Sequence, residues 1–169
     1  MKQVVILLGL LLAVMVNGCG NSKAVEAPSG SIWQAVMSGG TGTSSGFSFN
    51  TQFTVSSGGV LSFSTGTFQL LNQDTCFGNL SSNAITPSGT LSTTYNSADQ
   101  VTGTLAFTIT SPKGDVITLA STSVTGTVNP NNNYLLSGGS IIGTWTLVPG
   151  SGSSCVAASG SFTMTQTGT

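Results

Sequence analysis

Apolar and polar residues alternate along this chain with a period of two, and that alternation limits most strongly what it can fold into. In residues 47–55 the odd positions carry Phe, Phe, Thr, Phe and Val, and the even positions carry Ser, Asn, Gln and Thr. In residues 101–109 Val, Gly, Leu, Phe and Ile alternate with threonine and alanine. Successive side chains of a β-strand point to opposite faces, so this period indicates strands with one buried face. The sequence therefore predicts an all-β protein.

Turn-forming clusters separate the alternating stretches. They are Ser-Gly-Gly at 57–59, Ser-Pro-Lys-Gly-Asp at 111–115, Asn-Pro-Asn-Asn-Asn at 129–133 and Pro-Gly-Ser-Gly at 149–152. No segment has the apolar stripe and caps of an amphipathic helix. The expectation is about eight to ten strands. They are expected near residues 31–37, 47–56, 60–71, 89–95, 101–110, 116–128, 134–148 (one strand or two) and 155–166.

Short turns between consecutive strands favour an antiparallel meander that closes as a small β-barrel or, alternatively, forms a two-sheet β-sandwich. A local pattern bears on this choice: glycine, then serine or threonine, then an apolar residue. An inward glycine marks a bend, a bulge or space for a bulky neighbour, and its repetition suits a sharply curved barrel. The alternative is that Gly-Thr pairs are simply common in a chain with 23 Gly and 25 Thr. If the glycines point inward, six apolar residues of the pattern share one core: Phe68, Leu91, Leu105, Val128, Trp145 and Phe162.

Residues 1–18 have the features of an export signal. Lys2 gives a positive start, residues 4–16 are an unbroken apolar run, and Cys19 follows after Asn17 and Gly18. The apolar run suits a secretory signal and is short for a bilayer span, which takes about 20 residues. Together, Val16 to Cys19 resemble the lipobox of bacterial lipoproteins, although Asn17 stands where that motif more often has Ala or Ser.

The lipobox resemblance implies a lipid anchor. A diacylglycerol group would be transferred to the thiol of Cys19, cleavage would make Cys19 the first residue, and in many bacteria the new amine would be acylated. The protein would then be held on a membrane by its palmitate-type acyl chains. Gly20 follows the cysteine, which in this family implies the outer membrane in a cell that has one. Two other interpretations stay open: an ordinary signal peptide in which Cys19 lies near the cut, or a buried apolar helix. The expected organisation is a signal peptide at 1–18, a lipidated tether at 19–30 and one β domain at 31–169.

Charged residues are rare. The whole chain has 3 Lys or Arg, 4 Asp or Glu and no His. Binding nucleic acid requires lysines and arginines in number to neutralise phosphates, so a nucleic-acid partner is excluded. After residue 18 the charged residues are two lysines and four carboxylates: Lys23, Lys113, Glu26, Asp74, Asp99 and Asp115.

The same scarcity leaves little material for catalysis. Without histidine there is no Ser-His-Asp or Cys-His arrangement. Glu26 lies in the tether and Asp115 in a turn, so a glycosidase-like pair of carboxylates would have to be Asp74 and Asp99. The chain has no Asp-x-Asp cluster for calcium, no spare ligands for zinc and no phosphate-binding glycine loop. No enzyme activity, metal or cofactor is therefore expected.

Three cysteines become two once Cys19 carries lipid. Cys76 and Cys155 then form an even pair in an exported protein, where disulfides persist. The alternatives are two free thiols or a metal pair that lacks other ligands. The sequence predicts a disulfide with Cα atoms roughly 4.4–6.8 Å apart.

Two functions outside catalysis follow from these features. Gly143-Thr144-Trp145 resembles the Gly-x-Trp of lipocalin- and avidin-like barrels, with a core tryptophan as the alternative. The whole chain resembles small, β-rich, Gly/Ser/Thr-rich bacterial lipoproteins of unassigned function. One hypothesis is a non-catalytic, lipid-anchored envelope lipoprotein that binds a small apolar ligand or an envelope component. The other is a structural or adhesive cell-surface module. An interior pocket favours the first, and a filled core with a Thr-rich outer face favours the second.

Overall fold

A computed structural model describes residues 25, 31–40, 44–56, 59–63, 67–72, 76–77, 84–129, 131 and 135–168. The signal peptide, Cys19 and, apart from Val25, the tether lie outside the described residues. In the part that is described, no helix is long and apolar enough to cross a membrane. Every regular element described is a β-strand, so the all-β expectation is confirmed.

Nine strands make up one sheet over the described ranges. They are β1 (Ile32–Gly39), β2 (Ser48–Val55), β3 (Leu61–Phe63), β4 (Gln69–Leu70), β5 (Thr86–Tyr95), β6 (Gln100–Thr110), β7 (Val116–Asn129), β8 (Leu135–Val148) and β9 (Ala158–Gly168). The expected single strand at 60–71 was wrong, because β3 and β4 are separate and pair with opposite ends of β2. The stretch 134–148 holds one long strand, and the last strand begins at 158 rather than 155.

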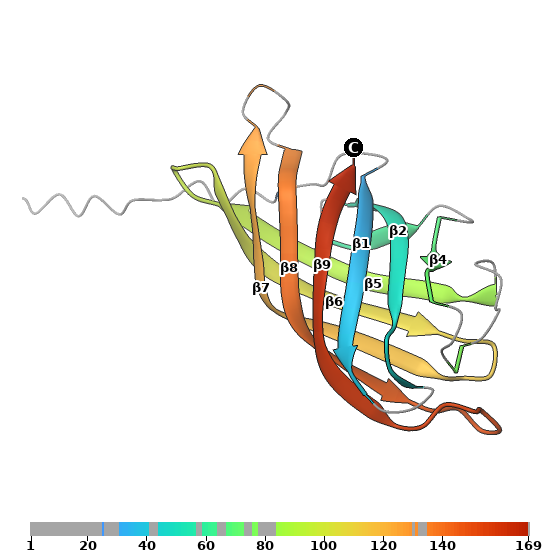
Figure 1. The fold of residues 1–169 in the computed structure, drawn as a ribbon. Coiled ribbons are helices and arrows are strands. Elements are labelled where there is room, and N and C mark those ends of the chain that lie inside the picture. Colours follow the sequence, from blue (N-terminus) through green and yellow to red (C-terminus); the bar gives the residue numbers. More distant parts are fainter. Residues whose placement is uncertain are drawn as a thin grey trace, which may run out of the picture.

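The strands form a nearly closed, antiparallel barrel. Their order is β3-β2-β1-β9-β8-β7-β6-β5, with β4 beside β2, so the last strand returns to pair with the first. Figure 1 shows the sheet curling round until β5 and β6 pass behind β1 and β9. One seam, between β3 and β5, is not sealed by a ladder. It is crossed by a bridge between Val60 and Thr90 and by the N–H of Leu91, which donates to the Gly59 carbonyl at 2.8 Å.

The seam explains why β5 begins at Thr86 and not at residue 89, as expected from the sequence. The backbone N–H groups of a strand point alternately to its two edges. Because the N–H of Leu91 points to the seam, the backbone nitrogen of Pro87, four residues earlier, points to the seam as well. Proline has no N–H, and within sheets it is therefore confined to positions that face an unpaired edge. Pro87 fits this strand because its missing donor would have no ladder partner.

Bulges bend the long strands. Strand β7 shifts register against β6 between Thr102 and Ala106, and against β8 between Ser121 and Ser123. At this bend the Ser121 hydroxyl accepts the N–H of Leu105 at 2.7 Å, replacing a ladder bond. A bulge bends its strand and increases the local twist. Figure 1 shows the result in β7, β8 and β9, which turn sharply along their length and wrap the core.

The inward residues of the strands fill this barrel. The six apolar residues of the Gly-Ser/Thr pattern are each 4% exposed or less, which confirms the predicted register. Three pattern glycines face aromatic residues across the ladder: Gly89 opposite Phe107, Gly143 opposite Phe162, and Gly160 opposite Trp145. A Cβ added at Gly143 or at Gly160 would lie 2.7 Å from the ring of Phe162 or of Trp145, so these two glycines leave space that the rings occupy.

Aromatic rings run through the interior in continuous contact. One chain of rings joins Trp33, Phe53, Phe63, Phe107 and Phe49, with centroids 5.4 to 5.8 Å apart. A second group links Phe47 to Trp145 and to Phe77, at 5.7 and 5.5 Å. These are the separations of packed aromatic pairs. Both groups of rings belong to one connected core of buried residues.

Candidate functional site

None of the nine strands contains a charged residue, so the described charges lie in turns at the two ends of the barrel. Asp99 is in the β5–β6 turn. Lys113 and Asp115 are in the β6–β7 turn, at the other end of β6. We call these the Asp99 end and the disulfide end. Asp74 and Glu26 lie outside the described residues, so the distance from Asp74 to Asp99 is not described and the expectation of no catalytic pair stays a prediction.

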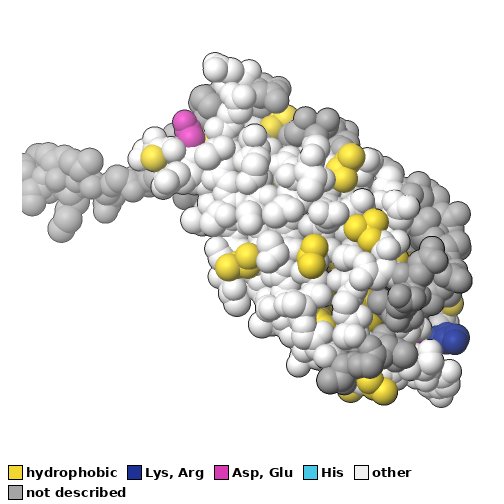
Figure 2. Space-filling model, in the orientation of Figure 1, with side chains coloured by type: hydrophobic (Ala, Val, Ile, Leu, Met, Phe, Trp, Pro, Cys, Tyr) yellow, Lys and Arg dark blue, Asp and Glu magenta, His cyan; other side chains and the backbone are white. Residues whose placement is uncertain are grey.

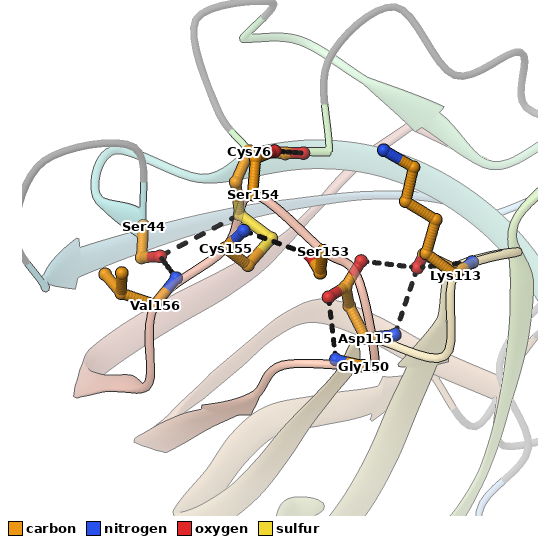
Figure 3. The surroundings of a disulfide bond; sticks show 10 residues. Ser44, Cys76, Lys113, Asp115, Gly150, Ser153, Ser154, Cys155 and Val156 are labelled. Atoms are coloured by element: carbon orange, nitrogen blue, oxygen red, sulfur yellow. Dashed lines mark hydrogen bonds between the residues drawn. A yellow bond between two sulfur atoms is a disulfide. The ribbon is translucent and has the colours of Figure 1, made fainter.

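Cys76 and Cys155 are joined by a disulfide with a Cα–Cα distance of 4.8 Å, inside the predicted range. Cys155 lies between β8 and β9, and Cys76 follows β4. The bond therefore ties the C-terminal hairpin to the N-terminal half of the barrel (Figure 3). Cross-linking positions 79 apart stabilises by roughly 4–5 kcal/mol in the chain-entropy model.

Serine hydroxyls hold the loops around this bond. Buried Ser44, from the β1–β2 connection, lies 3.8 Å from Cys76 Sγ and accepts the N–H of Val156 at 2.9 Å. Ser153 accepts the N–H of Cys155 at 2.9 Å. Figure 3 shows these side chains converging on the disulfide from three separate segments. The bond therefore lies within a hydrogen-bonded cluster of loops.

Asp115 extends this cluster to the β6–β7 turn. Its carboxylate accepts the Ser111 hydroxyl at 2.6 Å and the N–H of Gly150 at 2.9 Å, and the side chain is 2% exposed. Burial alone raises the pKa of this carboxyl, but hydrogen bonds from Ser111, Ser153 and Gly150, with the nearby charge of Lys113, outweigh it and lower the pKa below its ordinary value. Asp115 is therefore an ionised link between two loops. The sequence indicated only a turn former, and no local signal in it pointed to the second loop.

At the disulfide end, the Cys76–Cys155 bond and the hydrogen bonds of Asp115 hold separate loops together, and we call this arrangement the clasp. Both carboxylate oxygens of Asp115 accept hydrogen bonds from the protein, one from Ser111 and one from Gly150, so this side chain links two loops. Over the described ranges, no group of three or more His, Cys, Asp or Glu is placed to hold a metal ion.

Rows of hydroxyl and amide side chains cross the outer face. Neighbouring strands lie about 4.8 Å apart, so partners in register form a row at that spacing. The first row, the short row, is made of hydroxyls on five strands: Ser88, Thr108, Thr118, Thr146 and Ser159. The second, the long row, runs over eight strands: Thr94, Thr102, Thr125, Ser140, Thr165, Gln34, Asn50 and Gln69.

Apolar side chains interrupt this outer face only in small groups. Val36 and Ile142, about half exposed, flank Thr163 on β1, β8 and β9. Figure 2 shows hydrophobic side chains as separate spots on a surface made mostly of uncharged polar atoms. Isolated exposed apolar residues are ordinary on a protein surface and mark no site. The distinguishing feature of the exterior is therefore its uncharged hydroxyl rows.

Three buried side-chain polar atoms lack a partner among the described residues: Trp33 Nε1, Thr51 Oγ1 and Asn50 Oδ1, the last on the β2 residue of the long row. Trp33 Nε1 and Thr51 Oγ1 are fully buried, and their residues are paired across β1 and β2. Trp145 differs, because its Nε1 donates to the Ser38 carbonyl at 2.9 Å. Buried polar groups are nearly always hydrogen-bonded, so each exception needs a reason.

Comparison with protein-family models, curated proteins and solved structures finds no match to this chain.

Proposed function

We propose that this protein is a non-catalytic, lipid-anchored envelope module whose outer hydroxyl rows contact neutral, hydroxylated polymers of the cell envelope. The observation that carries the proposal is the long row, in which hydroxyl and amide groups succeed one another across eight strands. Hydroxyl and amide groups both donate and accept hydrogen bonds, as the hydroxyls of a glycan do. A surface of this kind is suited to many weak, matched contacts.

The packed interior and the uncharged strands support this function over a carrier function. Rings in contact at 4.9 to 5.8 Å occupy the space in which a barrel carrier would hold its cargo. Strands without charge give no electrostatic preference for an anionic or cationic partner. The lipobox resemblance at Cys19 supports attachment to the membrane, which would hold the outer face close to the envelope.

Sedimentation with insoluble neutral polysaccharide tests the adhesive function. Wild-type protein is expected to pellet with the polymer and to remain bound in high salt, because neutral contacts are not screened. Thr102→Lys with Thr125→Lys places charge on two neighbouring, exposed positions of the long row and should abolish pelleting. Ser97→Lys with Ser151→Lys, in exposed turns, is the charge-matched control and should bind like wild type. Failure of wild type to pellet, or equal binding by the two variants, would refute the proposal.

The anchor is tested separately. Wild-type protein is expected to incorporate labelled palmitate and to partition into detergent, whereas Cys19→Ala should do neither and should keep its signal uncleaved or misprocessed. Release of wild type as a soluble protein that begins at another residue would contradict the anchor. It would leave the sedimentation result valid, because that experiment depends only on the barrel.

One observation favours a second candidate, a small apolar ligand held inside the barrel through one polar group. Buried Trp33 Nε1 offers a donor and Thr51 Oγ1 a donor or acceptor, and neither has a partner among the described residues. A ligand that binds only the folded state raises the melting temperature. Apolar alcohols and ketones should therefore raise the melting temperature of wild type but not of Trp33→Phe. A flat response across such compounds removes this candidate.

A further inference from the structure

Val25 is the residue of the predicted tether that the structure describes, and it is buried. Its side chain is 3% exposed and belongs to the same core cluster as the barrel interior. Its N–H donates to the Thr93 carbonyl at 3.3 Å, and its carbonyl accepts the Thr93 hydroxyl at 2.7 Å. Composition alone placed Val25 in a flexible tether, and a lone valine among polar residues gives no periodic signal that would have said otherwise.

The partner of Val25 lies on the open edge of β5. Thr93 is two residues from Leu91, whose N–H points into the β3–β5 seam, so Thr93 turns the same backbone edge to that seam. Thr93 is itself 3% exposed, and its hydroxyl, a polar group inside the core, is satisfied by Val25. Val25 therefore binds the β5 edge at Thr93, beside the seam, and satisfies the buried Thr93 hydroxyl. In the sequence, Val25 lies close to the proposed lipid-attachment motif at Cys19.

We propose that Val25 docks the anchor-bearing segment on the β5 edge and thereby fixes the orientation of the barrel on the membrane, with the Asp99 end toward the lipid and the disulfide end away from it. This inference rests on the proposed lipid anchor at Cys19. Six residue steps separate Cys19 from Val25 and span at most about 20 Å. A free tether through residue 30 would reach about 40 Å, so docking halves the distance over which the barrel can move.

The register of β5 identifies the end of the barrel that faces the membrane. Tyr95 pairs with Val101 beside the β5–β6 turn, whereas Thr86 pairs with Thr110 beside the β6–β7 turn. Thr93 is therefore close to the Asp99 end, and Figure 1 shows the two turns at opposite ends of the molecule. The Cys76–Cys155 clasp and its loops would then point into the space away from the membrane.

Trypsin digestion tests the docking, because the mature chain offers this protease only Lys23 and Lys113. Cleavage after Lys23 separates the barrel from the anchor. Cleavage after Lys113 falls inside the disulfide-closed loop and leaves the two pieces joined on a non-reducing gel. A protease needs several extended residues on both sides of the cut, and Val25 lies two residues beyond it. Docking should therefore slow cleavage after Lys23.

The informative variant is Thr93→Val in the full mature protein. It keeps the shape of the side chain and removes the hydroxyl that holds the Val25 carbonyl, so the cut after Lys23 should be about tenfold faster. Thr94→Val, on the exposed face one residue along, is the matched control and should cut like wild type. Equal cleavage of Thr93→Val and wild type overturns the docking. Equal acceleration at Lys23 and Lys113 also overturns it, since that indicates opening of the whole barrel.

Energy transfer to labelled lipid in vesicles tests the orientation. A dye at Ser97→Cys, at the Asp99 end, should transfer more strongly than one at Pro112→Cys, at the disulfide end, because these ends are about 25 Å apart along tilted strands. Equal transfer from the two sites overturns the orientation. If the protein does not bind vesicles at all, the anchor fails, and with it the orientation. The digestion result still decides whether Val25 is docked.

Discussion

Replacing Gly143 with alanine tests whether the barrel depends on its inward glycines. An ideal Cβ at this position would lie 2.7 Å from Phe162 Cε1, 2.7 Å from Ser121 Cα and closer still to the Ala120 carbonyl oxygen. Two of these three obstacles are backbone atoms of β7, which cannot rotate away as a side chain can. The strand pair must separate locally, or the Phe162 ring must leave its position.

The expected cost follows from those distances. Overpacking of a close-packed site costs about 1–3 kcal/mol, and a backbone obstacle places Gly143→Ala at the upper end of that range. Alanine restricts the unfolded chain more than glycine does, which by itself stabilises the folded state by about 0.4–1 kcal/mol. After this gain is subtracted from the overpacking cost, the free energy of unfolding should fall by about 2 kcal/mol. With a urea slope of about 2 kcal/mol per molar, the unfolding midpoint should fall by about 1 M.

Gly168→Ala is the matched control, because its ideal Cβ meets only Ile32, at an ordinary contact distance of 3.6 Å, and no positive φ is involved. It should be neutral or slightly stabilising. Glycines at 138 and 152 are unsuitable controls, since both have positive φ and a side chain there is strained whatever the space. An unfolding midpoint for Gly143→Ala within about 0.3 M of that for Gly168→Ala would refute the reasoning.

Further changes probe the hydrogen bonds and the clasp. Trp145→Phe should cost about 0.5–1.5 kcal/mol more in unfolding free energy than Trp33→Phe, because only the first removes a hydrogen bond; equal losses in urea unfolding would contradict this. Asp115 has a lowered pKa when folded, so its contribution is complete above the unfolded value of about 3.9 and is lost as pH falls through the folded value. Asp115→Asn should therefore be less stable than wild type at pH 7, the difference should shrink as pH falls below about 3.9, and a difference independent of pH would exclude the carboxylate as the cause. Denatured, non-reduced protein should titrate no thiol at Cys76 or Cys155, and breaking the bond should cost about 2–5 kcal/mol; two titratable thiols would show that the bond is absent.

Alternation predicted which residues point inward, because side-chain direction along a strand is set by parity alone. This is why Phe68 and Phe162, far apart in the sequence, were both assigned correctly to the core. Strand limits were less predictable. The alternation of apolar and polar residues shows which side chains point inward, but not where pairing with the neighbouring strand ends. The break between β3 and β4 was therefore not predictable from residues 60–71. The start of β5 at Thr86 instead of residue 89 was also not predictable, because the position of Pro87 is tolerated only at the seam of the finished sheet.

Contacts between loops far apart in the sequence could not be predicted, for a different reason. The disulfide could be predicted because only two cysteines remained to pair. Asp115 and Gly150, by contrast, are two of many polar and glycine residues in turns, and nothing local specifies that they meet. The same holds for Val25 and Thr93, 68 positions apart. Such contacts follow from the closed barrel, which brings particular turns together after the strands have paired.

Closure of the ring by its first and last strands has a consequence for how the chain folds. Ile32 and Thr167, which are hydrogen-bonded across β1 and β9, lie 135 positions apart, so this ladder cannot begin until the whole domain is available. Pairing over such a separation raises the contact order, which is associated with slow folding. Until they meet, β1 and β9 are both free edges without a single charged residue to discourage pairing with other chains. Aggregation during refolding should therefore rise steeply with protein concentration.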